Sequence, residues 1–208
     1  MTARIAAIVP VGSLEAAKSR LGGALDAEER QDLADRMLAR TLSAALAVDS
    51  LADVLVVSPD REVLRRAADL GARTLRQRTV GLNPGLTEAR ADVVAGGADA
   101  LIVLPIDLAF VGAGALAAVV APLLGADTSP VVALVADRHG TGTNALGLRP
   151  PNVIDFAFGP GSRDAHRAAA ELAGARYVEV QGPLAFDIDT PTDLVIVENA
   201  TAETIGVD

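Results

Sequence analysis

Short apolar runs alternate with longer segments of helical periodicity along the whole chain. Residues 4–10 and 54–59 read as strands, and residues 26–47 read as a long helix that begins with a capping-box pair. Such alternation is typical of a largely parallel sheet with helices packed against it. The run at 100–105 is apolar throughout, as expected for a strand buried on both faces. Further strands are expected at 72–77, 130–137, 143–151 and 176–180, and further helices at 61–71, 86–97, 115–124, from 162 and from 191.

The chain reads as one α/β domain over residues 1–208. Half of its residues are apolar, which is enough for a sizeable core, and it contains no repeat, linker or low-complexity tract. The longest apolar run, at 115–126, is broken by Pro122 and is shorter than the ~18 residues of a membrane span. The apolar segment at 5–11 is short and runs into a polar loop, so it predicts a first core strand rather than a signal peptide.

Charge and cysteine content exclude several classes of partner and chemistry. The formal net charge is -9 and no run of basic residues occurs, so nucleic acid and anionic membranes are not expected as partners. The chain has no cysteine, which excludes disulfides and thiolate metal sites and fits a cytoplasmic protein. A small anionic substrate remains compatible where basic residues reverse the charge locally.

One lysine stands out among the basic residues. Seventeen of the 18 are arginine, and the only lysine is Lys18. An ammonium group is a compact, flexible point charge, unlike the rigid planar fork of arginine, so the position could require lysine. Chance explains the pattern equally well until the neighbouring residues are considered.

The segment FDIDTPTDL, residues 186–194, places three aspartates within seven positions. Thr190 can cap a helix that starts at Pro191, and Asp193 is then the third helical residue, whose side chain can reach back to the cap. Asp193 is therefore expected to be structural. Asp187 and Asp189 lie two apart in an expected short strand, so both carboxylates should point to one face.

Ligands of an open parallel sheet bind outside the carboxyl ends of its strands, and polar residues gather at those ends. Asp107 follows the strand at 100–105, and Asp187 and Asp189 belong to the late strand. Together they would form an oxygen-ligand cluster suited to Mg²⁺, with Lys18 and Arg20 after the first strand ready to bind phosphate. This arrangement describes phosphoryl or nucleotidyl transfer. Each aspartate alone could equally be a turn or cap residue.

The segment GTGTNA, residues 140–145, matches the dinucleotide fingerprint in letters only. That fingerprint requires a following helix, whereas a strand-like pattern with two prolines follows here, so a dinucleotide site is rejected. A phosphate-binding P-loop motif is also absent from the sequence. The segment reads either as a substrate loop that uses its amides and the hydroxyl of Thr141 or Thr143, or as an ordinary glycine turn.

A second glycine-containing segment, FGPGSRDAH at 158–166, precedes an expected helix. Gly159 and Gly161 would expose backbone N–H groups at the positive end of the helix, where Ser162 can act as the cap. A carboxylate or phosphate would fit there, and His166 lies on the same side as Ser162. His139, by contrast, reads as a surface residue. Asn83 could contact a base through its amide or cap the helix that begins near Pro84.

Taken together and in order, these motifs resemble one family. AAKSRL after the first strand, then GLN, LPxD, GTNAL, FGxGSxxxH and DxDTPxDL, are similar to the guanylyltransferases of coenzyme F-420 biosynthesis, which act on 2-phospho-L-lactate or phosphoenolpyruvate. The likeness covers nearly the whole chain. It implies a GT-A-like nucleotidyltransferase fold, a Rossmann-like three-layer α/β/α sandwich with a mostly parallel sheet, which uses GTP and Mg²⁺.

The resemblance also assigns residues. It implies that the three aspartates hold metal, that the phospho-acid is bound by Thr143, Gly159 and Ser162, and that the nucleotide is bound by Lys18, Arg20 and Asn83. Two positions depart from the family pattern. Gly12 stands where a lysine is frequent, which affects one phosphate contact, and Ala109 stands where a proline is frequent.

The implied reaction is attack by a phosphate oxygen of the acid on the α-phosphorus of GTP, with release of pyrophosphate. Phosphoenolpyruvate is the expected acid, because the alanine- and arginine-rich composition suggests a GC-rich bacterial source. Another GT-A enzyme, such as a sugar or molybdopterin nucleotidyltransferase or a glycosyltransferase, is the first alternative, and a non-catalytic nucleotide-binding protein is the second. Expected partners are GTP, the phospho-acid and a downstream transferase, with the oligomeric state open and a homodimer among the options.

Overall fold

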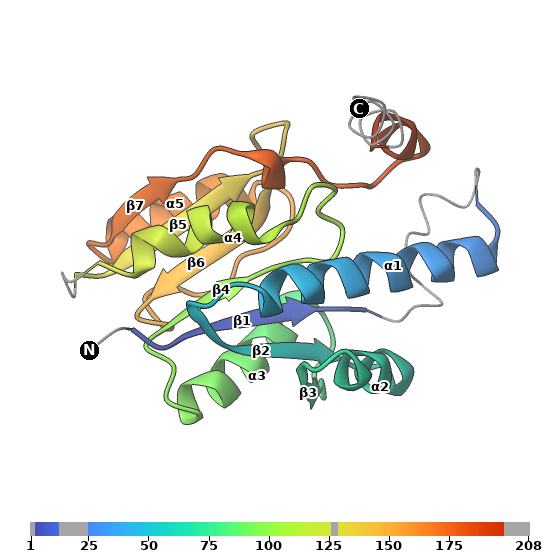
Figure 1. Ribbon diagram of the computed structural model, residues 1–208. Coiled ribbons are helices and arrows are strands. Elements are labelled where there is room, and N and C mark those ends of the chain that lie inside the picture. The colour runs from blue at the N-terminus through green and yellow to red at the C-terminus, as the bar shows by residue number, and fades with distance from the viewer. Residues whose placement is uncertain (1–2, 13–24, 126–128, 198–208) are drawn as a thin grey trace.

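The computed structural model describes residues 3–12, 25–125 and 129–197. A seven-stranded sheet forms its centre, in the order β3-β2-β1-β4-β6-β5-β7 (Figure 1). The strands are β1 (Ile5–Pro10), β2 (Leu51–Ser58), β3 (Arg73–Arg76), β4 (Ala100–Val103), β5 (Val131–Ala136), β6 (Thr143–Arg149) and β7 (Arg176–Glu179).

The sheet is mostly parallel, which confirms the expected class. β1 pairs in parallel with β2 and β4, β2 with β3, and β5 with β7. β6 pairs antiparallel with both of its neighbours, β4 and β5. The described part of the sheet therefore contains one reversed strand in its interior.

Helices cover both faces of the sheet and complete three layers. α1 (Ala27–Leu46), α2 (Arg61–Asp69) and α4 (Ala113–Val120) contribute to one apolar core, whereas α3 (Leu82–Ala95) and α5 (Ser162–Leu172) contribute to the other (Figure 1). Alternate residues of the strands feed the two cores: Ile5 and Val9 of β1 belong to the first, and Ile8 belongs to the second. Short 3-10 turns lie at η2 (Ala121–Leu123) and η3 (Pro183–Ala185), and a further helix occupies residues 191–197.

The reversed direction of β6 follows from a short connection. Only residues 137–142 separate it from β5, too few for the crossover of a dozen or more residues that a parallel pair requires. Ala136 consequently pairs with Thr143 at the turn. The first residue of β6 therefore lies at the sheet edge where the parallel strands end. Because β6 begins at Thr143, the expectation that a strand and not a helix continues from the GTGTNA segment is confirmed.

Helix caps were predicted correctly at two places and wrongly at two. Thr190 caps the helix at 191–197, because its Oγ1 accepts the N–H of Asp193 at 3.4 Å. Asp26 caps α1 and makes the expected capping box with Glu29. α3 begins at Leu82 with Gly81 as its N-cap, so Asn83 does not cap it, and α5 begins at Ser162 with Gly161 as its N-cap, so Ser162 does not cap it either. Both glycines have positive φ, 101° and 73°, a conformation that glycine adopts without strain, and the chain enters these helices without a side-chain cap.

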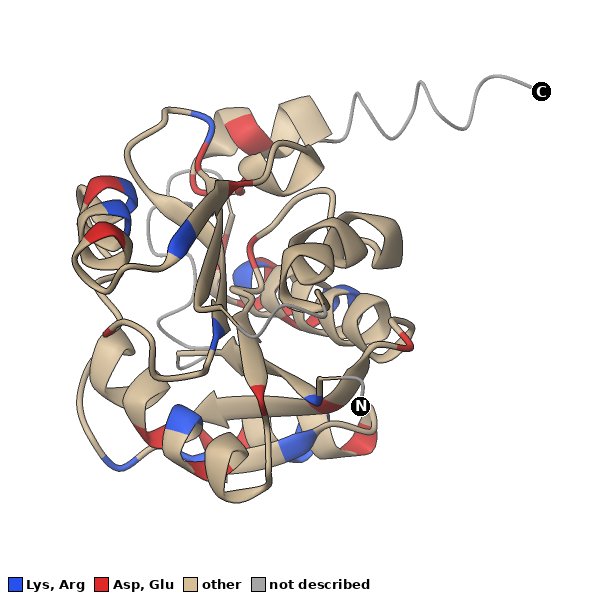
Figure 2. Cartoon of the chain, turned by 90° about the vertical axis from the view of Figure 1, so that its left-hand side faces the viewer, with Lys and Arg blue, Asp and Glu red and all other residues tan. Residues whose placement is uncertain are grey.

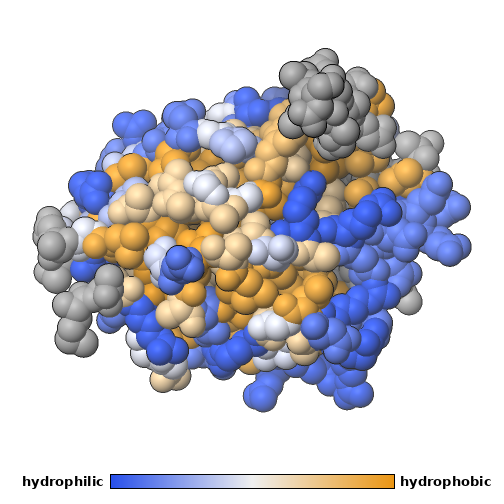
Figure 3. Space-filling view, viewed as in Figure 1, coloured by the Kyte–Doolittle hydropathy of each residue, from blue (hydrophilic) through white to orange (hydrophobic). Residues whose placement is uncertain are grey.

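Many charged residues lie on the helices and loops (Figure 2), whereas apolar side chains gather on one face (Figure 3). Figure 2 shows acidic and basic residues of both signs on the helices and loops. Apolar side chains gather on the face that α4 covers (Figure 3), and the exposed positions of α4 are Gly114, Ala117 and Ala118. Within the described residues, the structure has no helix with both the length and the apolar character needed to cross a membrane.

Candidate active site

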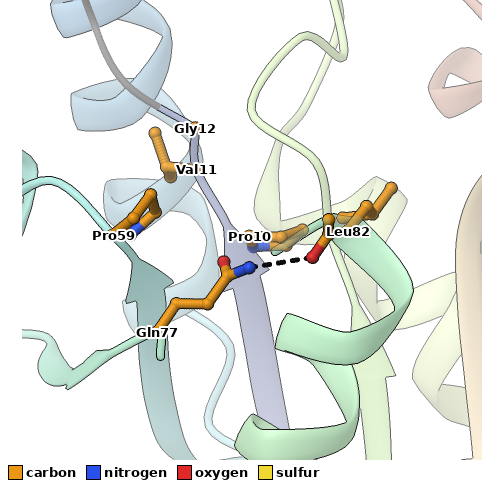
Figure 4. A pocket seen from close by; sticks show the side chains of 7 residues that line it. Pro10, Val11, Gly12, Pro59, Gln77 and Leu82 are labelled. Atoms are coloured by element: carbon orange, nitrogen blue, oxygen red, sulfur yellow. Dashed lines mark hydrogen bonds between the residues drawn. The ribbon is translucent and has the colours of Figure 1, made fainter. Parts of the chain in front are cut away.

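A pocket of about 250 Å³ opens where β1, β2 and β3 end (Figure 4). Its walls come from the residues that directly follow these strands and from the start of α3. Pyrrolidine rings and aliphatic groups supply most of the surface, which is suitable for the flat face of an aromatic base. The lining residues are Pro10, Val11, Gly12, Pro59, Gln77, Gly81 and Leu82.

Gln77 supplies the polar side-chain group of this pocket. Its amide nitrogen donates to the main-chain oxygens of Thr79 and Gly81, at 2.7 and 2.8 Å. Because both amide hydrogens are directed at carbonyl groups, the orientation of the carboxamide is fixed, and its oxygen points away from the Gly81 carbonyl (Figure 4). The pocket thus presents a hydrogen-bond acceptor.

The Gln77 side chain can pack against α3 only because residue 85 is a glycine. A Cβ atom at residue 85 would lie 2.5 Å from the Cδ of Gln77, which is too close for the two to coexist. Gly85 is itself buried in α3. The sequence analysis did not identify either residue, although a glycine inside a helical pattern is a known sign of a close approach by another group.

The three predicted aspartates come from two segments that lie side by side. Ile188 N–H donates to the main-chain oxygen of Asp107 at 2.9 Å, and Ala109 N–H donates to that of Phe186 at 2.8 Å. The FDID segment was expected to be a short strand, but it does not join the main sheet. It is an extended segment that forms an isolated bridge between Leu108 and Asp187. It is too short to add another ladder.

Like charges surround the Asp187 carboxyl group. Its pKa is raised, first by burial and then by the negative charges of Asp189 and Asp107, with Arg138 acting in the opposite direction. The structure therefore places Asp107 and Asp189 close enough for their charges to act on Asp187. Among residues 3–12, 25–125 and 129–197, no three acidic or histidine side chains are arranged so that they could hold one metal ion. The metal assignment stays a prediction.

Arg138, in the turn between β5 and β6, supports the acidic segment. Its Nη1 donates to the main-chain oxygen of Asp187 at 2.9 Å, and its Nη2 pairs with Asp193 at 2.7 Å. The guanidinium group also lies over the ring of Phe186, 4.5 Å from its centroid. Sequence analysis did not identify this arginine, because only the reversed strand brings the turn next to a segment 50 residues later.

Asp193 has the structural role that was expected. Its Oδ2 accepts the backbone N–H groups of Asp189 and Thr190, at 2.9 and 2.7 Å, and its side chain is almost completely buried. Burial alone would raise the pKa of Asp193, but these hydrogen bonds and Arg138 together lower it by more. The net shift of the pKa is therefore downward. A charged Asp193 therefore connects the acidic segment to the helix at 191–197.

The two glycine-containing segments meet at the same end of the sheet. Arg163 N–H, at the start of α5, donates to the main-chain oxygen of Thr141 at 3.2 Å. Thr143 and Ser162, both buried, are also brought close, because Thr143 Oγ1 lies 3.0 Å from Nδ1 of His166 one turn into α5. Gly159 and Gly161 adopt φ values of 136° and 73° in the loop that precedes the helix. Ser162 N–H donates to the main-chain oxygen of Gly159 at 3.1 Å, so, contrary to expectation, the first two N–H groups of α5 are not exposed, and the anion site stays a prediction.

Asn83 connects the pocket side to this loop. Its amide nitrogen donates to the main-chain oxygen of Phe158 at 3.0 Å, and its oxygen accepts the N–H of Phe158 at 2.9 Å. These two bonds hold the start of α3 against the residue before Gly159. The described geometry thus gives Asn83 a positioning role, and direct contact with a base stays a prediction.

The predicted phosphate-binding residues Lys18 and Arg20 lie outside the described residues. Gly12, where the family pattern often has a lysine, is described and lines the pocket at the end of β1. Ala109, the other departure, packs with Met37 and Ile188 in a small apolar cluster beneath the acidic segment. An alanine is thus accommodated there by close packing.

Comparison with known proteins agrees with this arrangement. Residues 5–200 match the family model described as "Guanylyl transferase CofC like". The chain is 46% identical to a protein from Sphaerobacter thermophilus named phosphoenolpyruvate guanylyltransferase, over 90% of this chain and 89% of that one. It is 45% identical to a protein of the same name from Rubrobacter xylanophilus, over 92% of each chain.

A solved structure shows the same fold at low sequence identity. A nucleotidyl transferase from Methanothermobacter superimposes with a TM-score of 0.68 at 18% identity, covering 97% of this chain and 99% of that one. The three-layer fold with a mostly parallel sheet is therefore that of nucleotidyltransferases. From the match over residues 5–200 and the two relatives, the chain belongs to the CofC-like guanylyl transferase family and is a nucleotidyltransferase.

Proposed function

We propose that the chain transfers GMP from GTP to the phosphate of phosphoenolpyruvate and releases pyrophosphate, as a step of coenzyme F-420 biosynthesis. The observation that carries the proposal is the 45–46% identity to two proteins named phosphoenolpyruvate guanylyltransferase, across about nine tenths of the chain. The site supports it, because a pocket of about 250 Å³ opens at the ends of β1, β2 and β3, and the segment with Asp187 and Asp189 lies beside Asp107. One nucleotidyltransferase domain over residues 1–208 would contain the whole site.

The guanine ring would occupy the pocket at the ends of β1, β2 and β3. Pro59 and Leu82 provide apolar contact for its faces, and the carboxamide oxygen of Gln77 can accept from the N1–H and the exocyclic amino group of guanine. Adenine offers no N–H at N1 and would leave this acceptor less well satisfied. Asn83, in the first turn of α3, would position the loop that receives the acid.

Asp107, Asp187 and Asp189 fit the chemistry of a magnesium site. Their oxygens are the ligands that Mg²⁺ prefers. The pKa of Asp187 is raised by burial and by the charges of Asp189 and Asp107, and a bound cation would offset both effects. When bound, Mg²⁺ would neutralise the charge that develops on the phosphates of GTP. Arg138 and Asp193 keep the acidic segment in place for that purpose.

The phospho-acid would bind at the start of α5, with Thr143, Gly159 and Ser162 around it. The N–H groups of Ser162 and Arg163 already donate to main-chain oxygens. The Thr143 hydroxyl and the positive end of the helix would therefore receive its carboxylate or phosphate. The attacking phosphate oxygen needs no general base, because the second phosphate pKa is about 6 and the group is already ionised. This chain's residues would thus contribute orientation and charge balance, with Lys18 and Arg20 on the GTP phosphates.

Pyrophosphate release tests the proposal. Purified protein with Mg²⁺ is given GTP or ATP, together with phosphoenolpyruvate, 2-phospho-L-lactate or 3-phosphoglycerate in separate reactions, each repeated with a chelator. Release with GTP and phosphoenolpyruvate, abolished by the chelator, is the expected result. Release with GTP and another acid would change the assigned substrate, and no release with any of the three acids would contradict the proposal.

Two further expectations belong to the same proposal. The protein would act in the cytoplasm, where both substrates are available, and would pass its product to a downstream transferase. Its oligomeric state is open, with a homodimer among the options, and the mass measured by light scattering at micromolar concentration decides between monomer and dimer. The two expectations can be examined by fractionation of cells and by supplying the product to a purified downstream enzyme.

A further inference from the structure

His166 is a completely buried histidine that has no role in the proposed reaction as described so far. It projects from the second turn of α5, and its ring lies edge-on to Phe158, with the ring centroids 5.1 Å apart. Both ring nitrogens make hydrogen bonds. A buried polar ring with both nitrogens used has a defined orientation, so its hydrogen positions can be derived from its partners.

The backbone of Ala157 determines which nitrogen carries the proton. Its N–H donates to Nε2 of His166 at 3.0 Å, so Nε2 must hold a lone pair. In the neutral ring the single hydrogen is then on Nδ1, which faces Thr143 Oγ1 at 3.0 Å. Burial lowers the pKa of His166 to about 4, which keeps the ring neutral near pH 7.

The direction of this hydrogen bond decides what Thr143 can do. Because Nδ1–H donates, Oγ1 of Thr143 accepts, and the hydrogen of the Thr143 hydroxyl must point elsewhere. Within the described part of the chain, His166 is the one hydrogen-bond partner of Oγ1. Thr143 keeps a small exposed surface of 8% at the start of β6, next to the glycine loop that precedes α5.

We propose that His166 is a positioning residue that holds the hydroxyl of Thr143 as a hydrogen-bond donor toward the phospho-acid. The inference rests on the proposed function, because it takes the acid to bind at the start of α5. It adds a residue that does not touch the acid and acts through Thr143. The acceptor in the ligand would be an anionic oxygen, which a hydroxyl directed by a fixed donor matches well.

Two substitutions separate this role from a purely structural one. In His166→Gln the carboxamide reaches the place of Nε2, so it can accept from Ala157 but cannot donate to Thr143. In His166→Asn the carboxamide lies near the place of Nδ1, so donation to Thr143 is kept and the bond to Ala157 is lost. His139→Gln, which changes an exposed histidine in the turn at 137–142, is the matched control.

Steady-state kinetics with each substrate varied provides the first readout. His166→Gln should raise KM for the acid about 10-fold and leave KM for GTP unchanged, as Thr143→Val does, and the double variant should be no worse than Thr143→Val alone. His166→Asn should keep the acid KM within about 2-fold of the parent. The inference would be overturned if the two substitutions raised the acid KM additively in the double variant. It would also be overturned if His166→Asn had a larger acid KM than His166→Gln.

The ¹⁵N chemical shifts of the histidine rings provide a readout that does not depend on activity. His166 should show a protonated Nδ1 and an unprotonated Nε2 at pH 7. The chain has two histidines, so the ring signals that remain in His139→Gln belong to His166. The opposite tautomer would overturn the inference even in an active enzyme. If the predicted tautomer is found but no acid supports turnover, the proposed function fails instead, so the two failures can be distinguished.

Discussion

Nη1 of Arg138 donates to the main-chain oxygen of Asp187 at 2.9 Å, while Nη2 of the same guanidinium group pairs with Asp193 at 2.7 Å. One side chain from the β5–β6 turn thus fixes the acidic segment at two points. Asp193 in turn accepts two backbone N–H groups, including that of Asp189. Two of the carboxylates that would hold the metal, Asp187 and Asp189, are therefore positioned by an arginine that need not touch a substrate.

Replacement of Arg138 should impair the site more than the fold. Arg138→Lys keeps a charge for Asp193 but cannot make both contacts, and we expect a 10- to 100-fold higher Mg²⁺ requirement, the usual range for a residue that orients metal ligands. Arg138→Ala should also lose stability, of the order of 3 kcal/mol, because the nearly buried Asp193 loses its partner.

Magnesium titrations of turnover and urea unfolding measure these two effects. Arg65→Ala is the matched control, because its side chain is 60% exposed and its ion-pair partners among the described residues are neighbours on α2. A wild-type magnesium requirement in Arg138→Lys would show that the two-point contact does not position the carboxylates.

Removal of the Gln77 carboxamide should affect the nucleotide and not the acid. Gln77→Ala is expected to raise KM for GTP about 10-fold, the cost of about one good hydrogen bond, with the acid KM unchanged. Gly85→Ala should reproduce this effect without touching the pocket, because the added Cβ would lie 2.5 Å from the Gln77 side chain and displace it. Gly114→Ala, at an exposed helical position with open space around it, is the control. An unchanged GTP KM in both variants would place the base elsewhere.

Asp187→Asn should remove most turnover and leave the protein folded. The substitution keeps the shape and the main-chain bond to Arg138 but removes the charge that Mg²⁺ requires. Relief of repulsion from Asp189 and Asp107 should make the magnesium-free variant at least as stable as the parent. Pyrophosphate release together with thermal unfolding checks both statements, and full activity in Asp187→Asn with Mg²⁺ would refute the metal assignment.

Stability should fall on acidification because of His166. Its pKa is lowered from 6.5 to about 4 by burial, so the unfolded chain binds more protons than the folded one between these values. The stabilisation is complete above pH 6.5 and is lost as pH falls toward 4, by at most about 3 kcal/mol. Urea unfolding of the parent and of His166→Gln across this range tests it, because the parent should lose more stability than the variant. Parallel curves would contradict the shift.

Much of the fold could be predicted from the sequence, because local patterns determine it. Apolar runs and the Asp26 capping box mark β1, β4 and α1 correctly. The direction of β6 was not predicted, although the six-residue connection that precedes it was visible in the sequence. Asn83 and Ser162 were wrongly expected to cap helices, because glycines with positive φ are the N-caps of both helices. The local sequence does not indicate whether the glycine or the nearby polar residue will be the N-cap.

Candidate site residues could be named from the sequence where they lie within recognisable motifs. Asp107, Asp187, Asp189, Thr143 and the glycine loop before α5 were named in this way and stay predictions, and the structure places Asp107 and Asp189 close enough for their charges to act on Asp187. Arg138 and Gln77 were not identified, because their roles depend on partners supplied by other elements. A lone arginine or glutamine carries no local signal of such a contact.

The most direct test of the central claim is ³¹P NMR of a single reaction that contains the protein, Mg²⁺, GTP and phosphoenolpyruvate. Attack on the α-phosphorus predicts that the GTP signals are replaced by pyrophosphate and by the two coupled signals of a new diphosphate bridge between GMP and the acid. Unchanged GTP, or its conversion to GDP without a bridged product, would contradict the assignment of this chain as a phosphoenolpyruvate guanylyltransferase.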